Sequence, residues 1–243
     1  MAAVAVDDTV FWMGAEEFYV YSGSVQKLPC TVRDYVFNDF NTDQKEKVFA
    51  GLNSSFSEIW WFYPSSSSTD IDRYVVYNYE QQVWYYGTLA RTAWIDRGIN
   101  VNPISAGTDN YLYDHETGSD DGSTLPNTAI NAYIESSQID IGDGDRFAFI
   151  RRLIPDLTFR DSTASSPTAN FILKARNFPG GFYDQTTTSG VVRSATVPVE
   201  QFTNQANVRL RGRSFAIRVE SDATEVTWRL GSPRVDIRSD GGR

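Results

Sequence analysis

Short runs of aromatic and β-branched residues, separated by turns rich in Gly, Asn, Asp and Ser, recur roughly every ten residues along this chain. Such runs favour strands over helices, because branched and aromatic side chains pack well on a pleated surface. A helical pattern is limited to residues 41–52, where Val48 and Leu52 are four apart, and this segment is predicted to form one short helix or helical turn. The sequence therefore predicts an all-β protein.

Residues 1–100 contain two blocks that repeat the order strand, strand, turn, strand. The predicted strands are 9–12, 17–21 and 24–29 in the first block and 58–63, 73–79 and 83–87 in the second. Trp12 and Trp60 lie about 50 residues apart, the repeat length of some β-propeller blades. We therefore predict partial propeller-like blades, with ordinary meanders as the alternative. Two blades cannot close a propeller, so their open edges indicate an assembly or a longer polypeptide.

The rest of the chain is predicted to form two further segments. Residues 101–145 are an acidic, loop-rich connection, and residues 146–243 are an Arg-rich antiparallel β lobe resembling a sandwich. Its predicted strands are 147–154, 157–159, 169–175, 197–202, 208–211, 215–221 and 225–230. The apolar phase changes across Gly212, which predicts a bulge or a turn at that position.

The charged residues are distributed unevenly. The chain has a net charge of −9, but residues 1–145 carry 7 basic and 22 acidic side chains, whereas residues 146–243 carry 15 basic and 9 acidic ones. All but one of those 15 are Arg, which pairs well with carboxylates and phosphates. This favours ion pairing between the lobes, within one chain or between copies, over a nucleic-acid surface. Arg209, Arg211 and Arg213 are the candidate interface or DNA-facing residues.

The sequence offers little that could carry catalysis. With Cys30 as its one cysteine and His115 as its one histidine, the chain cannot form an intramolecular disulfide or a multi-histidine or multi-cysteine metal site. Asp114, His115 and Glu116 match no metal motif and are predicted to lie at a polar hairpin tip, and residues 139–145 lack the ligand order of a calcium loop. We predict a protein that is not an enzyme, with no catalytic residue, no metal and no cofactor.

Two other classes of function receive little support. Trp60, Trp61, Trp84 and Tyr85 could stack on sugars, but their positions within strands favour core or inter-sheet packing. No apolar run approaches the ~20 residues that a membrane-spanning helix needs, so no membrane partner is predicted.

Several segments taken together carry a family resemblance. They are RYVVYNY (73–79) with Val83, Trp84 and Gly87, RTAWID (91–96), His115 and Glu116 with Gly118, YIES (133–136) through to Asp145, RRLIPD (151–156) and WRLGSPRVDIRSDG (228–241). In this order the chain resembles virion structural proteins of tailed bacteriophages, in particular the propeller-containing tail-hub or packaged-DNA stabilisation proteins of short-tailed phages.

The resemblance implies a mechanical function. It implies a tail hub, nozzle or adaptor ring, made in the bacterial cytoplasm and built into the virion, that extends or closes the portal channel and retains packaged DNA. The expected partners are identical copies in a ring, a hexamer by analogy, together with portal or adaptor proteins, tail fibre or needle proteins and DNA in the channel. Since such proteins are usually larger, it also implies a C-terminal portion or a shortened relative. The alternative is a receptor-binding or glycan-binding tail module, with or without glycan-cleaving activity.

Overall fold

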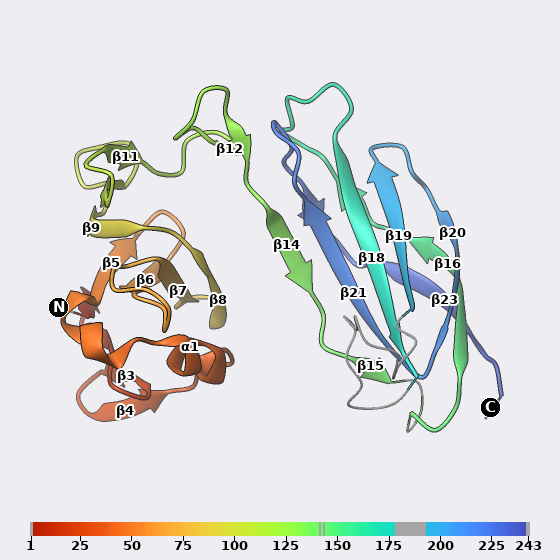
Figure 1. Ribbon diagram of the computed structural model, residues 1–243, viewed down its shortest axis with the longest axis horizontal. Coiled ribbons are helices and arrows are strands. Elements are labelled where there is room, and N and C mark those ends of the chain that lie inside the picture. The colour runs from red at the N-terminus through yellow and green to blue at the C-terminus, as the bar shows by residue number, and fades with distance from the viewer. Residues whose placement is uncertain (1, 141, 143, 178–192, 242–243) are drawn as a thin grey trace. The chain divides into compact units, whose positions relative to one another are not determined.

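The structure is a computed structural model that describes residues 2–140, 142, 144–177 and 193–241. Strands dominate it, and the all-β prediction is confirmed: among the described residues, helix is confined to α1 (Arg33–Asp39) and the 3-10 helix η1 (Thr42–Lys47). No helix in this part of the chain is long and apolar enough to cross a membrane. The chain divides into two compact units, Met1–Thr117 and Gly118–Arg243 (Figure 1).

The first unit contains three antiparallel sheets in which consecutive strands are neighbours. The first is β1 (Ala3–Val6), β2 (Thr9–Met13), β3 (Phe18–Tyr21) and β4 (Val25–Leu28); the second is β5 (Phe49–Asn53), β6 (Glu58–Tyr63), β7 (Arg73–Asn78) and β8 (Val83–Thr88); the third is β9 (Arg91–Ile95), β10 (Ile104–Gly107) and β11 (Leu112–Asp114). The predicted blocks thus have four strands each, since β1 and β5 precede the three that were expected.

These three sheets are stacked face to face. Phe18 and Trp61 lie between the first and second sheets, are fully buried and have ring centroids 5.0 Å apart. On the other face of the second sheet, Phe62 packs against Trp94 of β9, with a centroid distance of 5.6 Å. Gly51 allows this approach, because a Cβ there would meet the Trp94 ring at 2.4 Å. The second sheet is therefore covered on both faces.

The predicted helix at residues 41–52 is only partly correct. η1 is a 3-10 helix in which the Asn41 side chain accepts a hydrogen bond from the Asp43 backbone N–H at 3.1 Å, and the chain then enters β5 at Phe49. Pairing of β5 with β6 outweighs the helical spacing of Val48 and Leu52. The helix α1 was not predicted; it buries Val36 in the core of the first unit.

The second unit is a two-layer β structure with two short accessory sheets. One layer is β14 (Ala132–Glu135), β21 (Ser214–Ser221), β18 (Thr168–Arg176) and β19 (Arg193–Glu200), with β15 (Ile139–Asp140) also paired to β21; the other is β20 (Ala206–Gly212), β16 (Ala148–Ile154) and β23 (Arg234–Ser239); the accessory pairs are β12 (Asp120–Asp121) with β13 (Thr128–Ala129) and β17 (Leu157–Thr158) with β22 (Arg229–Leu230). Their shared core includes Ile150, Phe171 and Leu210, as expected for a sandwich-like lobe.

Gly212 lies where the chain leaves one layer for the other. β20 ends at Gly212 in the three-stranded sheet, and β21 begins at Ser214 in the five-stranded sheet. A Cβ at position 212 would lie 2.8 Å from the Cβ of Ala175, so glycine permits the close approach of the two layers. The phase change seen in the sequence is therefore a turn between sheets.

The segment at residues 101–145 does not form a separate connection. Its first part supplies β10 and β11 to the third sheet of the first unit. Its last part supplies β14 and β15, which pair with β21 of the second unit. Sheet pairing thus assigns the two ends of this acidic segment to different units.

Candidate functional site

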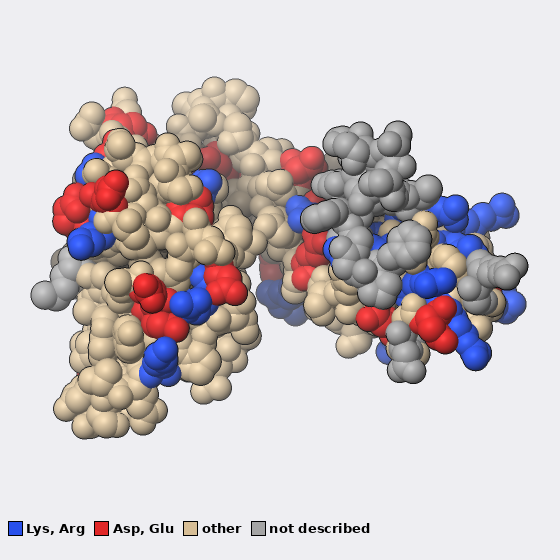
Figure 2. Space-filling view, turned by 60° about the horizontal axis from the view of Figure 1, so that its bottom comes forward, with Lys and Arg blue, Asp and Glu red and all other residues tan. Residues whose placement is uncertain are grey.

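The outer face of the three-stranded sheet β20–β16–β23 carries many arginines. Val208, Leu210, Val235 and Ile237 point into the core, so the residues that alternate with them point outward. We call the resulting outward set the Arg-rich face: Arg151, Arg152, Arg209, Arg211, Arg234 and Arg238, with Asp236 and the adjacent Asp240. Register places Phe149 opposite Arg211 on one side and Arg238 on the other. Figure 2 shows blue side chains gathered on this unit.

The three predicted arginines are brought together in part. Arg211 and Arg213 both lie over the Phe147 ring, with guanidinium carbons 3.9 and 4.8 Å from its centroid. Arg213 reaches this ring from beyond the turn at Gly212. Arg209 is exposed and makes no hydrogen bond or ion pair with any residue that the structure describes. Arg211 and Arg213 therefore form a cluster around Phe147, and Arg209 lies on the same strand as Arg211 without a partner among the described residues.

Two aspartates neutralise part of the Arg-rich face. Arg151 donates to Asp236 Oδ2 from Nη2 at 2.6 Å and from Nε at 3.2 Å, while Arg152 approaches the same oxygen at 3.8 Å. These hydrogen bonds hold the pKa of Asp236 below its usual value. Arg211 is paired with Asp240. Among the described residues, this face thus carries six arginines and two carboxylates, an excess of positive charge.

The opposite face of the sandwich carries a cluster of paired charges. There, Glu135 pairs with Lys174 at 2.9 Å and with Arg218 at 3.2 Å, and Arg218 also pairs with Glu220 at 2.5 Å. The Arg218 guanidinium lies over the Tyr133 ring at 3.8 Å. Two cations and two carboxylates pair in this cluster, so its charges are balanced.

The division into units changes the charge distribution that the sequence suggested. Residues 1–117 carry 7 basic and 16 acidic side chains, a net charge of −9, whereas residues 118–243 carry 15 of each. The acidic residues 118–145 belong to the second unit, so the two units are not oppositely charged. The electrostatic asymmetry lies between an acidic first unit and one basic face of a neutral second unit.

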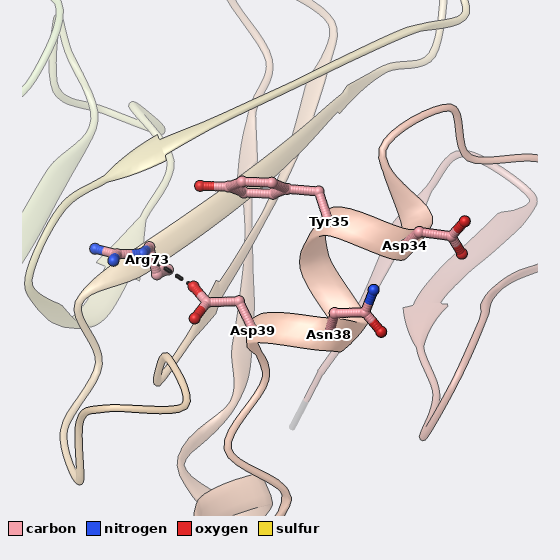
Figure 3. A pocket seen from close by; sticks show the side chains of 5 residues that line it. All are labelled: Asp34, Tyr35, Asn38, Asp39 and Arg73. Carbon is pink, nitrogen blue, oxygen red and sulfur yellow. Dashed lines mark hydrogen bonds and ion pairs between the residues drawn. The ribbon is translucent and has the colours of Figure 1, made fainter. Parts of the chain in front are cut away.

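A shallow hollow lies beside α1 in the first unit. Asp34, Tyr35, Asn38, Asp39 and Arg73 line it, and Arg73 donates from Nε to Asp39 Oδ2 at 3.2 Å (Figure 3). Asp39 also accepts from Ser66 Oγ at 3.0 Å, and Tyr35 stacks on Tyr86 with centroids 3.9 Å apart. The charged groups Asp39 and Arg73 are paired with each other, so the hollow presents no obvious ligand-binding chemistry.

His115 does not lie at a hairpin tip as predicted. It follows β11 and is half-buried against Trp94, with ring centroids 4.7 Å apart. Its Nε2 accepts from Ser105 Oγ at 2.6 Å and from Arg91 Nε at 3.3 Å, which requires a neutral ring. Burial, with help from the Arg91 charge, lowers the pKa of His115 to about 4. Such an imidazole is a weak general base near pH 7, although it has a serine hydroxyl beside it.

The depressed pKa of His115 predicts a pH-dependent stability. Because its folded pKa of about 4 lies below the ordinary value of 6.5, the folded state binds fewer protons, and stability is lost as the pH falls from about 6.5 towards 4. Urea unfolding should show a loss over this interval that is about 1–2 kcal/mol larger in the native chain than in His115→Gln, reduced from the full value by partial solvation. If the native chain and His115→Gln lost the same free energy of unfolding over this interval, the buried, neutral state of His115 would be contradicted. Assembly of the variant should be unchanged at pH 7.

A second polar cluster lies next to the aromatic rings of the second sheet. The fully buried Asn53 donates from Nδ2 to Glu116 at 3.0 Å and lies 3.5 Å from Glu58, which also accepts from Trp60 Nε1 at 3.0 Å and from Tyr85 Oη at 2.5 Å. Burial and the nearby Glu58 charge raise the pKa of Glu116. The carboxylates of Glu58 and Glu116 thus accept hydrogen bonds from neighbouring side chains of the first unit.

The aromatic side chains considered for sugar binding are used mainly in packing. Trp60 and Trp61 are buried. Trp84 stacks on Trp61 at a centroid distance of 5.8 Å and donates from Nε1 to the Pro29 carbonyl at 2.9 Å. Tyr85 is partly exposed, but its hydroxyl is bound to Glu58. A sugar would therefore find little free ring surface at these four positions.

Sequence reasoning missed part of the Arg-rich face. It selected two arginines of β20 and Arg213 just beyond its end, and it did not identify Arg151, Arg152, Arg234 and Arg238, which two neighbouring strands add. The alternation of charged and apolar residues in Arg234–Ser239 is a signal that could have found two of them. Within the described ranges, no three His, Cys, Asp or Glu side chains are grouped so that they could hold a metal ion. No protein-family model and no curated protein matches the sequence.

Proposed function

We propose that this protein is a structural component of a bacteriophage tail, where copies form a ring that extends or closes the portal channel and helps to retain packaged DNA. The observation that carries the proposal is the Arg-rich face, whose excess charge suits an anionic neighbour. The acidic first unit of another copy is one such neighbour, and portal or adaptor proteins are others. The segments that resemble tail-hub proteins are the reason for proposing a location in the phage tail.

The fold supports a mechanical role. The first unit is a stack of antiparallel sheets built from up-and-down strands, as in propeller blades, and the second is a sandwich-like lobe. Packed β-sheets of this kind can resist mechanical deformation, and this role needs no catalytic site. Fibre or needle proteins would then dock on the assembled ring.

Sedimentation velocity of the purified chain tests the ring. At micromolar concentration and low salt we expect one closed species several times larger than the monomer, and we expect the association to weaken as salt rises, because the contacts of the Arg-rich face are screened. A monodisperse monomer under all these conditions would contradict the proposal.

A further inference from the structure

The two end sheets of the first unit each have one face that no other described sheet of this unit covers, and both faces are largely apolar. In the first sheet, Phe11, Phe18 and Leu28 point into the core, so the residues alternating with them point outward. We call this outward set the leading face: Ala3, Ala5, Val10, Trp12, Tyr19, Tyr21 and Val25. Trp12 and Tyr19 stack on it at a centroid distance of 5.4 Å, and Val25 is 62% exposed.

The third sheet has a matching face at the other end of the stack. Trp94 and Ser105 point towards the second sheet, which leaves the alternate residues outward. We call this set the trailing face: Ala93, Ile95, Ile104, Ala106 and Leu112. Ile95 is 61% exposed and Leu112 is 77% exposed. Isolated apolar side chains are common on protein surfaces, but a contiguous apolar sheet face indicates a contact.

We propose that the trailing face of one copy packs on the leading face of the next, so that copies join head to tail. This inference rests on the proposed function, because it describes the contact between subunits of the proposed ring. Within one copy, sheets already stack on both faces of the second sheet. The proposed contact would extend this stacking from one copy to the next. A head-to-tail contact uses two different surfaces and closes into a ring when the rotation permits.

The charges beside the two faces agree with this pairing. Lys27 follows Val25 outward on β4, where it pairs with Glu17 at 3.2 Å but stays largely exposed, and Asp114 follows Leu112 outward on β11. A head-to-tail contact can therefore bring a cation of one copy towards an anion of the next.

The test uses Val25→Glu and Leu112→Glu, which place a carboxylate on the leading face and on the trailing face at the most exposed large apolar side chain of each. Each variant alone should lose at least tenfold in association, because an unpaired charge is costly in an apolar interface. Mixed in equal amounts they should form dimers and nothing larger, since each supplies the intact face that the other lacks. Sedimentation velocity separates these species. The control is Phe56→Glu, at an exposed apolar position in the β5–β6 turn, which should assemble like the native chain.

The outcomes separate this inference from the proposed function. If either single variant assembles like the native chain, or if the mixture yields no dimer, head-to-tail packing is wrong although the ring itself can stand. If the native chain stays monomeric, both the ring and this contact are refuted. Circular dichroism and thermal unfolding of each variant confirm that folding is intact before association is compared.

Discussion

Replacing Trp61 with alanine should lower the free energy of unfolding of the first unit by about 3–5 kcal/mol, the usual cost of removing a large aromatic side chain from a core. The Trp61 side chain is fully buried between the first and second sheets. It contacts Phe18 and Trp84, and its Nε1 donates to the Ala2 carbonyl at 3.0 Å. The substitution leaves a cavity and an unpaired acceptor.

Urea unfolding, followed by tryptophan fluorescence and circular dichroism, measures this loss. The matched control is Trp12→Ala, which removes the same side chain from the open leading face and should cost less than half as much in the dissociated chain. A loss below about 1 kcal/mol for Trp61→Ala would mean that the first and second sheets are not packed as described.

Replacing Arg209, Arg211 and Arg213 together with alanine should strongly impair ring formation and make the remaining association less sensitive to salt. Each single substitution should be mild, because exposed ion pairs contribute about 0–1 kcal/mol. The triple variant removes three of the seven arginines on and beside the Arg-rich face, including both that lie on Phe147. It also leaves Asp240 without its arginine partner, which adds a repulsive charge.

Light scattering and DNA binding on this triple variant distinguish the two roles of the cluster. If the arginines meet protein, assembly is lost; if they face packaged DNA, the variant assembles normally but binds DNA more weakly and with a shallower salt dependence. Normal behaviour in both assays would refute an intermolecular role. The control is Lys174→Ala with Arg218→Ala, which removes two cations from the cluster of paired charges on the opposite face and should leave assembly intact.

Much of the fold could be predicted from the sequence because period-two alternation is a local signal. The strands around Trp60, Val75 and Phe171 show aromatic and branched runs between clear turns, and all three residues lie in strands. β1 and β5 were missed because small residues such as Ala3 and Gly51 lower their apparent strand propensity, while pairing with β2 and β6 stabilises them. Such pairing with a neighbouring strand cannot be recognised from the residues of the strand alone.

The candidate site could be predicted only in part, because it depends on which strands become neighbours. Arg209 and Arg211 are two residues apart, so their common face follows from the sequence. Arg151 and Arg238 join them only because β16 lies between β20 and β23, a pairing between distant segments. The burial of His115 was likewise hidden, since Arg91 and Ser105 come from other strands of the third sheet.

Cryo-electron microscopy of tailed particles, purified from the strain that encodes this chain, tests the central claim most directly. The account predicts a ring of identical copies around the tail axis. In each copy the leading face should lie against the trailing face of a neighbour, and the Arg-rich face should meet an acidic surface. Particles whose tails contain no copy of the chain, or contain it only as isolated monomers away from the channel, would contradict the account.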